Sequence, residues 1–332
     1  MSNVELEQKF EAFRADFESL RREICKAFVG QADVVEGVLT ALVAGGHVLL
    51  EGLPGMGKTA LAHILADVLD VSFQRIQCTP DLMSADIIGT YVIMETPEGR
   101  RTFEFQRGPL FSNIVLADQI NRAMPKTQSA LLEAMDDTTV TVSTETFQLP
   151  LPYFVIATQN PLELEGTFPL PEAQLDRFLF KLAMHRPTPE EMETILDRTT
   201  EAEAVITQPV VDGPRVLEMG ELIRHVKIST DLRRKAIRLV TSTDPADSAA
   251  PEPVRRYVAH GAGPRGAQAL VLAAKTRALV AGRTEVAPAD VRGASAMALR
   301  HRIALNFDGQ AEGISPDSLL DQIVSQTAGL AG

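Results

Sequence analysis

The chain has 332 residues, enough for about two domains at roughly 150 residues each. Hydrophobic residues make up 45% of it and charged residues 23%, which excludes a disordered or fibrous chain. The formal net charge is −12 and aromatic residues amount to 5%, with no tryptophan, so the phosphate backbone of nucleic acid is an unsuitable partner for the chain as a whole.

The first half of the chain alternates between helix and strand patterns. Apolar residues three and four apart between positions 4 and 27 predict an amphipathic helix. Strands are expected at 47–51, 72–77, 114–117, 154–158 and 178–184, and helices at 58–69 and 125–135. The run at 114–117 is apolar without alternation, as in a strand buried on both faces. This alternation predicts an α/β layer with a mainly parallel sheet.

The pattern changes near residue 188, where Thr188 is placed to cap a helix that starts at Pro189. From there the sequence predicts helices only, at 189–203, 215–225, 230–241, 264–281, 288–302 and 316–327, with a flexible loop at 243–253. We therefore expect three parts: an N-terminal helix over 1–28, an α/β domain over 29–188 and a helical domain over 189–332.

Three features of the sequence concern the cellular compartment and membranes. Cys25 and Cys78 are far apart in the sequence and form no metal-ligand pattern, which predicts a reduced, cytoplasmic protein. The N-terminus is charged and lacks the apolar segment of a signal peptide. The longest apolar runs, such as 38–46, are too short to span a bilayer, so we expect no membrane segment.

The segment Gly52-Leu-Pro-Gly-Met-Gly57-Lys58-Thr59 has the spacing of a phosphate-binding loop, between a predicted strand and a predicted helix. Glycines let backbone N–H groups turn toward a phosphate, and the helix N-terminus adds a positive dipole end. Lys58 would contact the β- and γ-phosphates of ATP. A glycine-rich turn with an incidental lysine is the alternative. The loop residues expected to contact the nucleotide are Gly52, Pro54, Gly55, Met56, Gly57, Lys58, Thr59 and Ala60.

A metal-binding carboxylate is expected at the end of the 114–117 strand. The segment Asn113-Ile-Val-Leu-Ala-Asp118 is apolar and ends in an acid, which suits an aspartate that holds Mg²⁺ through water. The alternative is a strand that simply ends at a turn. Together with the hydroxyl of Thr59, Asp118 is the candidate metal-binding group of an ATP and Mg²⁺ site.

Five segments resemble those of MoxR-type AAA+ ATPases, in the same order and with the same spacing. They are the phosphate loop, Leu116-Ala-Asp-Gln-Ile-Asn-Arg122, Lys126-Thr-Gln-Ser-Ala-Leu-Leu-Glu-Ala-Met135, Ala157-Thr-Gln-Asn160-Pro and Glu172-Ala-Gln-Leu-Asp-Arg177-Phe. The similarity runs from about residue 29 to about residue 307. It implies a three-layer P-loop AAA+ ATPase domain with a C-terminal all-helical lid domain, in the branch that carries a hairpin in its second helix.

The resemblance also implies roles outside the loop. The segment Val29-Gly30-Gln31 resembles the part that contacts adenine; a glycine that caps a helix is the alternative. Asn160 resembles sensor 1, whose amide orients the attacking water; alternatively, it caps a turn before Pro161.

Two arginines complete the implied set. Arg177 resembles the arginine finger, which reaches the ATP of a neighbouring subunit and neutralises charge on the transferred phosphoryl group. Its alternative is a local salt bridge with Asp176 or Glu172. Arg265 resembles sensor 2 at the start of a lid helix, where a merely solvated cation is the alternative. A helix N-terminus is unfavourable for a cation, which favours a nearby phosphate.

Gln119 departs from the family, which carries glutamate after the magnesium-binding aspartate. An amide keeps the shape of that side chain but cannot accept a proton from the attacking water. We expect ATP and Mg²⁺ to bind while hydrolysis is badly impaired. The rest of the catalytic set is present, which favours a deliberate substitution that traps the ATP state over a natural variant.

Two hairpins and one basic segment remain. Hairpins are expected at 90–105, around Thr96-Pro-Glu-Gly99, and at 138–149; in related motors such hairpins touch the substrate or the central pore, and packing or subunit contacts are the alternative. The segment 224–238 holds six basic residues against one acid. We interpret it as a solvated helix face or a subunit contact rather than a nucleic-acid site.

The resemblance implies a homo-oligomer, most simply a hexameric ring, that uses ATP to remodel or activate a protein partner. The family's usual partners contain von Willebrand factor A domains. Three alternatives stay open: an ATPase subunit of a metal-chelatase-like complex, a nucleic-acid motor, and a non-hydrolysing scaffold whose assembly is gated by ATP.

Overall fold

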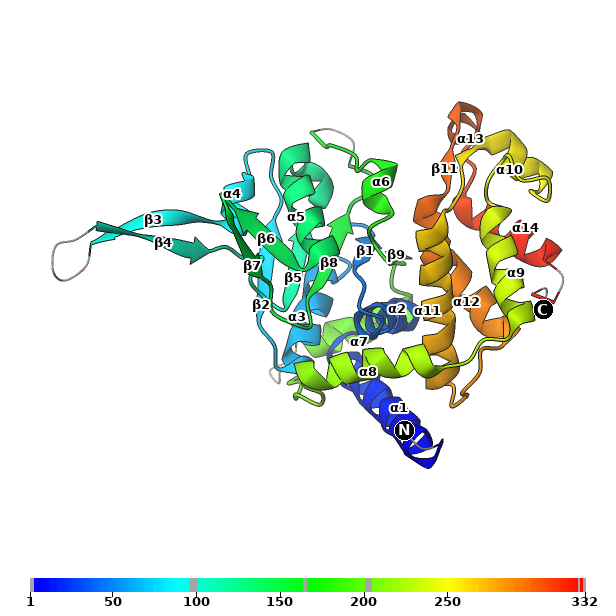
Figure 1. The fold of residues 1–332 in the computed structure, drawn as a ribbon, viewed down its shortest axis with the longest axis horizontal. Helices are drawn as coiled ribbons and strands as arrows, with labels where there is room; N and C mark the ends of the chain where they lie inside the picture. Colours follow the sequence, from blue (N-terminus) through cyan, green and yellow to red (C-terminus); the bar gives the residue numbers. More distant parts are fainter. Residues whose placement is uncertain (1–2, 96–100, 164–165, 201–204, 328, 331–332) are drawn as a thin grey trace.

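The computed structural model describes residues 3–95, 101–163, 166–200, 205–327 and 329–330 (Figure 1). The expected hairpin tip Thr96-Pro-Glu-Gly99 and the last residues of the helix expected over 189–203 lie outside these ranges. None of the described helices is both long and apolar enough to cross a bilayer.

A parallel five-stranded sheet forms the centre of the α/β part, as the sequence predicts. Its strands lie in the order β2 (Phe73–Gln77), β5 (Ile114–Asp118), β8 (Phe154–Gln159), β1 (Val48–Glu51) and β9 (Phe180–Ala183). β5 is buried along its whole length, because it lies between two other strands and is covered on both faces. Parallel pairing brings the carboxyl ends of β1, β5 and β8 to one edge of the sheet.

Alternation along these strands separates two hydrophobic cores. In β1, Val48 and Leu50 face one core while Leu49 faces the other, and β5 and β8 alternate in the same way. The first core is completed by α1 (Asn3–Ala27), α2 (Ala32–Val43) and α3 (Lys58–Leu69), and the second by α5 (Pro125–Asp137). The sheet therefore lies between two layers of helices, as a three-layer fold requires.

The C-terminal part is almost entirely helical. α7 (Pro189–Thr200) begins as predicted: the backbone N–H of Thr188 donates to Glu191, whose own N–H donates to the Thr188 hydroxyl. α9 (Thr230–Thr241), α11 (Pro264–Val280), α12 (Pro288–Leu299) and α14 (Pro316–Gln326) form a bundle beside the sheet (Figure 1). Its smaller elements, which the sequence did not predict, are α10 (Glu252–Tyr257), β10 (Val258–His260), β11 (Ala304–Leu305) and α13 (Phe307–Ala311).

The helix α8 (Gly213–His225) joins the two parts of the molecule, because it packs against α1 and α2 of the α/β part and against α11 of the bundle (Figure 1). The backbone N–H of Val210, just ahead of α8, donates to the carbonyl of Val68 in α3. The guanidinium of Arg215 in α8 pairs with Asp16 in α1 at 2.8 Å. Buried residues of α8, α11 and α12 belong to the same core as those of α1 to α3, so the lid is continuous with one face of the α/β layer.

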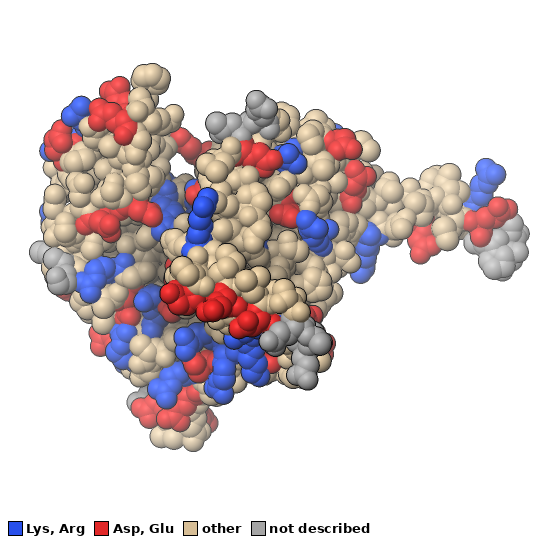
Figure 2. Space-filling view, turned by 180° about the vertical axis from the view of Figure 1, so that it is seen from behind, with Lys and Arg blue, Asp and Glu red and all other residues tan. Residues whose placement is uncertain are grey.

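Two antiparallel hairpins extend the α/β part. The first, β3 (Gly89–Glu95) with β4 (Arg101–Arg107), projects from the body (Figures 1 and 2). It follows the five-residue helix α4 (Ser84–Ile88), and residues 108–113 after it form turns rather than a second half of that helix. The second hairpin consists of β6 (Thr139–Val142) and β7 (Glu145–Gln148). It contacts the first hairpin through the stacked rings of Phe105 in β4 and Phe147 in β7, whose centroids lie 4.6 Å apart.

Candidate functional site

The phosphate-loop sequence joins the end of β1 to the start of α3, as predicted. Gly55 and Gly57 have φ angles of 80° and 81°, a conformation that favours glycine. At Gly57 a Cβ atom would also lie 2.9 Å from the ring of Phe28. These two glycines let the loop curve back over the N-terminus of α3 with its backbone amides free for an anion.

A cavity of about 410 Å³ lies against this loop. It is lined by most of the predicted site residues and by one that the sequence analysis did not select, Gln159. The lining residues are Pro54, Gly55, Met56, Gly57, Lys58, Thr59, Asp118, Gln119, Gln159 and Asn160. The loop, the end of β5 and the end of β8 meet here because all three follow parallel strands at the same sheet edge.

Lys58 carries the positive charge of this cavity. Its Nζ atom donates to the backbone carbonyls of Gly52 and Leu53 at 2.6 and 2.8 Å. Partial burial lowers the pKa of Lys58, and the nearby carboxylate of Asp118 opposes that change. A phosphate group would supply anionic oxygens in place of the two carbonyls, so the lysine fits the role predicted from its position in the motif.

Asp118 ends β5 as a buried carboxylate with protein donors on both oxygens. The hydroxyl of Thr158 donates to Oδ1 at 2.7 Å, and the guanidinium of Arg75 donates to Oδ2 through Nη2 at 2.6 Å and through Nε at 3.2 Å. Neither Arg75 nor Thr158 was among the site residues expected from the sequence. Their signal is weak in a sequence: both are single polar residues on strands that become neighbours only when the sheet forms.

Gln119 follows Asp118 in a left-handed conformation with φ 58°. Its backbone N–H donates to the Thr158 hydroxyl at 2.8 Å. Its side-chain Oε1 is buried and has no hydrogen-bond partner among the described residues. Gln119 as a residue lines the same cavity as Lys58 and Thr59.

Asn160 lies at the end of β8, as predicted. Its Oδ1 accepts from the backbone N–H of Leu162 at 3.2 Å, and its Nδ2 is 3.4 Å from an oxygen of Glu163. The turn-capping contact that we weighed as an alternative is therefore present, on a residue that also lines the cavity. Glu163 pairs in turn with Arg122 at 2.6 Å.

The segment 29–31 is held against the chain that follows β9. Gly30 and Gln31 have φ angles of 71° and 55°, and Gln31 is the residue before α2. The Gln31 amide donates to the backbone carbonyl of His185 at 2.6 Å and accepts from its N–H at 3.1 Å. Val29, Gly30 and Gln31 do not line the cavity, and neither do Gly52 or Ala60.

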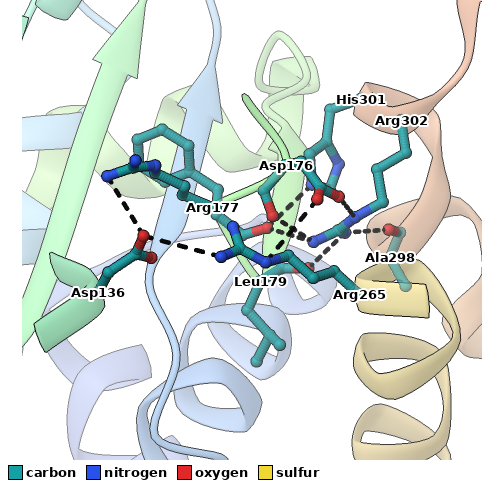
Figure 3. A network of polar contacts seen from close by, with 9 residues as sticks. Asp136, Asp176, Arg177, Leu179, Arg265, Ala298, His301 and Arg302 are labelled. Atoms are coloured by element: carbon teal, nitrogen blue, oxygen red, sulfur yellow. Dashed lines mark hydrogen bonds and ion pairs between the residues drawn. The ribbon is translucent and has the colours of Figure 1, made fainter. Parts of the chain in front are cut away.

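Arg177 and Arg265 converge on one carboxylate outside that cavity (Figure 3). Asp136, in the last turn of α5, lies 3.2 Å from Arg177 Nη1 and 3.7 Å from Arg265 Nη2. Arg265 is also 3.9 Å from Asp176. Within the described ranges, Arg177 forms its ion pair with Asp136 and not with Glu172 or Asp176, the partners weighed from the sequence.

Arg302 connects the lid to the chain beside Arg177 (Figure 3). Its side chain is 3% exposed and its Nε donates to Asp176 Oδ1 at 2.7 Å. The remaining donors contact the backbone carbonyls of Asp176, Phe178, Leu179 and Ala298. This buried, fully bonded guanidinium is a structural contact between lid and sheet, and no sequence motif indicated it.

We expect Arg302→Ala to lower the free energy of unfolding by about 3–5 kcal/mol, because it leaves Asp176 and several buried carbonyls without their donor. Urea unfolding followed by circular dichroism measures the change. Arg255→Ala, on the exposed face of α10, is the matched control and should change stability by less than about 0.5 kcal/mol. Equal stability of the two variants would show that Arg302 does not hold the lid.

The basic segment 224–238 lies at the end of α8 and along α9. Most of its cations are exposed, and Lys235 pairs with Asp231 at 2.7 Å, as expected for a solvated helix face. On the face seen in Figure 2, acidic and basic side chains adjoin one another.

A parallel sheet with a phosphate loop after β1, an acidic end to β5 and a helical lid defines an AAA-type ATPase. Residues 47–180 match the ATPase family associated with various cellular activities (AAA), and residues 253–323 match the AAA lid domain.

Relatives place the chain within that class. It is 40% identical over 327 residues to the chaperone MoxR1 of Mycobacterium tuberculosis, which covers 96% of this chain and 84% of the relative. It is 32% identical over 318 residues to the protein MoxR of Methylorubrum extorquens, which covers 89% and 90%. The crystal structure of a candidate ATPase from Cytophaga hutchinsonii superposes with a TM-score of 0.89 at 39% identity and covers 96% of both chains. The chain belongs to the MoxR family of AAA ATPases.

Proposed function

We propose that this chain binds Mg²⁺-ATP in the loop cavity, assembles into a ring, and remodels a protein partner, with hydrolysis slowed by Gln119. One observation carries the nucleotide site: Lys58, Thr59, Asp118, Gln119 and Asn160 line a single cavity although they follow three different strands. The names of the relatives, a chaperone among them, support remodelling as the use of the ATP.

The residues present suit both ATP and Mg²⁺. The curved loop and Lys58 offer donors to phosphate oxygens. The ammonium of Lys58 is partly buried, and an anion beside it would compensate for the hydration that it has lost. Thr59 and Asp118 offer the oxygen atoms that Mg²⁺ prefers. When bound, Mg²⁺ would neutralise charge on the β- and γ-phosphates.

Gln119 is the residue on which the proposed rate of ATP hydrolysis depends. The position faces the phosphate loop, where a carboxylate would take the proton of the attacking water. The amide of Gln119 cannot act as that base. Whether the glutamine is natural or was introduced deliberately, the same chemistry follows: ATP binds and persists. A scaffold that never turns over ATP is the second candidate, and this residue is the observation in its favour.

Assembly follows from the position of Arg177. Its guanidinium lies on Asp136, outside the cavity of its own chain, which is where a group that acts on a neighbour's nucleotide would be held. We propose a homo-hexamer in which Arg177 leaves Asp136 for the adjacent ATP, with Arg265 beside it. Native mass spectrometry with ATP and Mg²⁺ should detect six subunits; a monomer under those conditions would contradict a ring.

For the partner, we propose a protein with a von Willebrand factor A domain. The competing assignment, a metal-chelatase-like complex, predicts co-purification with a large chelatase subunit instead. The measurement is binding of the ATP-loaded chain to a purified protein that contains a von Willebrand factor A domain, with Lys58→Ala as the control that should not respond to ATP.

Arg177→Ala tests the shared active site. In a Gln119→Glu background, the variant should bind ATP as tightly as its parent while losing most of its turnover, because an arginine finger contributes a factor of ~10³–10⁵ to phosphoryl transfer. Nucleotide titration and steady-state phosphate release measure the two effects separately. The matched control is Arg255→Ala, at an exposed arginine of α10, which should turn over ATP like its parent.

Unchanged turnover in Arg177→Ala would make this residue structural. Arg122 would then become the candidate finger. It lies in the turn after β5 and pairs with Glu163, close to Asn160.

A further inference from the structure

The pair formed by Arg75 and Asp118 is a contact that the nucleotide site does not by itself require. Arg75 Nη2 and Nε lie 2.6 and 3.2 Å from the same oxygen, Oδ2 of Asp118. The Arg75 side chain is 46% exposed, whereas that of Asp118 is 12% exposed. A solvent-accessible cation thus covers a nearly buried carboxylate.

The sheet explains how this cation reaches Asp118. β2 is the edge strand beside β5, with Arg75 opposite Leu116 and Gln77 opposite Asp118. The guanidinium therefore reaches two residues further along the strand direction, from the position opposite Leu116 to Asp118 at the end of β5. It also donates to the Gln77 side chain. Among the described residues β2 is an edge strand, and because the Arg75 side chain is itself exposed it can move into solvent without opening the core.

The carboxylate has little capacity left for another ligand. An ionised carboxylate offers about four acceptor positions. Arg75 takes two of them on Oδ2 and the Thr158 hydroxyl takes one on Oδ1. A water bound to Mg²⁺ donates its protons to such an acceptor, and the dication would also repel the guanidinium beside it. Arg75 and the metal consequently compete for Asp118.

We propose that Arg75 is a positioning residue that stands in for the metal: it holds Asp118 while the site lacks Mg²⁺ and must leave it when Mg²⁺-ATP binds. The pair orients the buried carboxylate and supplies it with a charged partner when no metal is bound, since an unpaired buried charge is costly. Its loss on metal binding weakens the apparent affinity for Mg²⁺ and so sets the concentration at which the site loads. This inference rests on the proposed nucleotide site and on Asp118 as its metal-binding group.

The test measures binding, not turnover. The affinity for AMP-PNP is titrated with and without Mn²⁺, and the ratio of the two affinities reports the contribution of the metal. In Arg75→Ala this ratio should rise about three- to tenfold, the range for releasing a partly exposed, charge-assisted pair. The affinity without metal should stay within about twofold of the parent. Arg75→Lys, which keeps a charge without the two-nitrogen contact, should give a smaller rise.

Two controls separate this effect from a general disturbance of β2. Gln74→Ala alters the neighbouring exposed residue of the same strand and should leave the ratio unchanged. In an Asp118→Asn background, Arg75→Ala should no longer change the ratio, because the group for which the metal and the arginine compete is gone. Thermal melting adds a second readout. Without nucleotide, Arg75→Ala should have a lower melting temperature than the parent, and Mn²⁺-AMP-PNP should raise its melting temperature by more.

The outcomes are distinguishable. A ratio in Arg75→Ala that is unchanged or reduced overturns the stand-in role, and weaker binding of AMP-PNP without metal would mean that Arg75 contacts phosphate directly. Failure of the parent chain to bind AMP-PNP at all would instead overturn the proposed nucleotide site.

Discussion

Gln119→Glu should raise the rate of ATP turnover by a factor of about 10²–10⁴, the usual contribution of a positioned general base. The replacement changes the hydrogen-bonding character of the side chain and hardly its volume, so packing at the end of β5 should be unaffected. Gln119 lines the cavity, and its Oε1 is buried without a partner among the described residues. A carboxylate oxygen there could accept a hydrogen bond from the attacking water and then its proton.

Steady-state phosphate release at equal protein concentration measures this effect, and a nucleotide titration should show little change in affinity. Gln119→Ala is the control that removes the amide without adding a base, and it should stay as slow as the parent. Rates within a few-fold of each other for Gln119→Glu and the parent would mean that position 119 is not the base. Glu163, which is engaged by Arg122 and Asn160, would then be the next described candidate. Glu165 lies outside the described residues.

Lys58→Ala should abolish measurable ATP binding. Lys58 is the only cation within the loop sequence 52–59, and its ammonium is held over the cavity by two loop carbonyls. Without the Lys58 ammonium, only the loop amides and the dipole of α3 would remain to stabilise the negative charge of the triphosphate. The fold should persist, because those carbonyls can be hydrated at the cavity surface.

Isothermal titration calorimetry with ATP and Mg²⁺ measures the loss. Lys126→Ala makes the same change at the exposed start of α5 and should bind like the parent. Unchanged affinity in a folded Lys58→Ala protein would remove the phosphate-loop assignment and with it the ATPase proposal for this cavity. Melting curves of both variants without nucleotide distinguish a binding defect from unfolding.

Much of the fold could be predicted because its signals are local. The unalternating run 114–117 predicted a strand covered on both faces, and β5 is buried throughout. The Thr188 cap and the start of α7 depend on residues three apart, so their chemistry is readable along the chain. The phosphate loop combines a fixed spacing with a strand before it and a helix after it.

The helix α2 shows where local signals fail. Nine of its twelve residues, between Val34 and Val43, are buried. A short, largely apolar run of this kind does not by itself distinguish a buried helix from a buried strand. Its position between α1, α8 and the lid, not its sequence pattern, explains that burial. The small ribbon of β10 and β11 was missed for a related reason, since its strands are two and three residues long and pair across more than 40 residues.

The sequence by itself determined the residue types of the candidate site: a loop with one lysine, an aspartate at a strand end, and a glutamine where the family has glutamate. Only the tertiary structure decided which other residues contact them and where the arginines lie. It brought Arg75 from the edge strand to Asp118, and it placed Arg177 on Asp136 outside the cavity. It also buried Arg302 between lid and sheet. Each of these contacts joins residues 40 or more positions apart, and ion pairs at such separations depend on strand order and helix packing, which residue spacing along the chain does not encode.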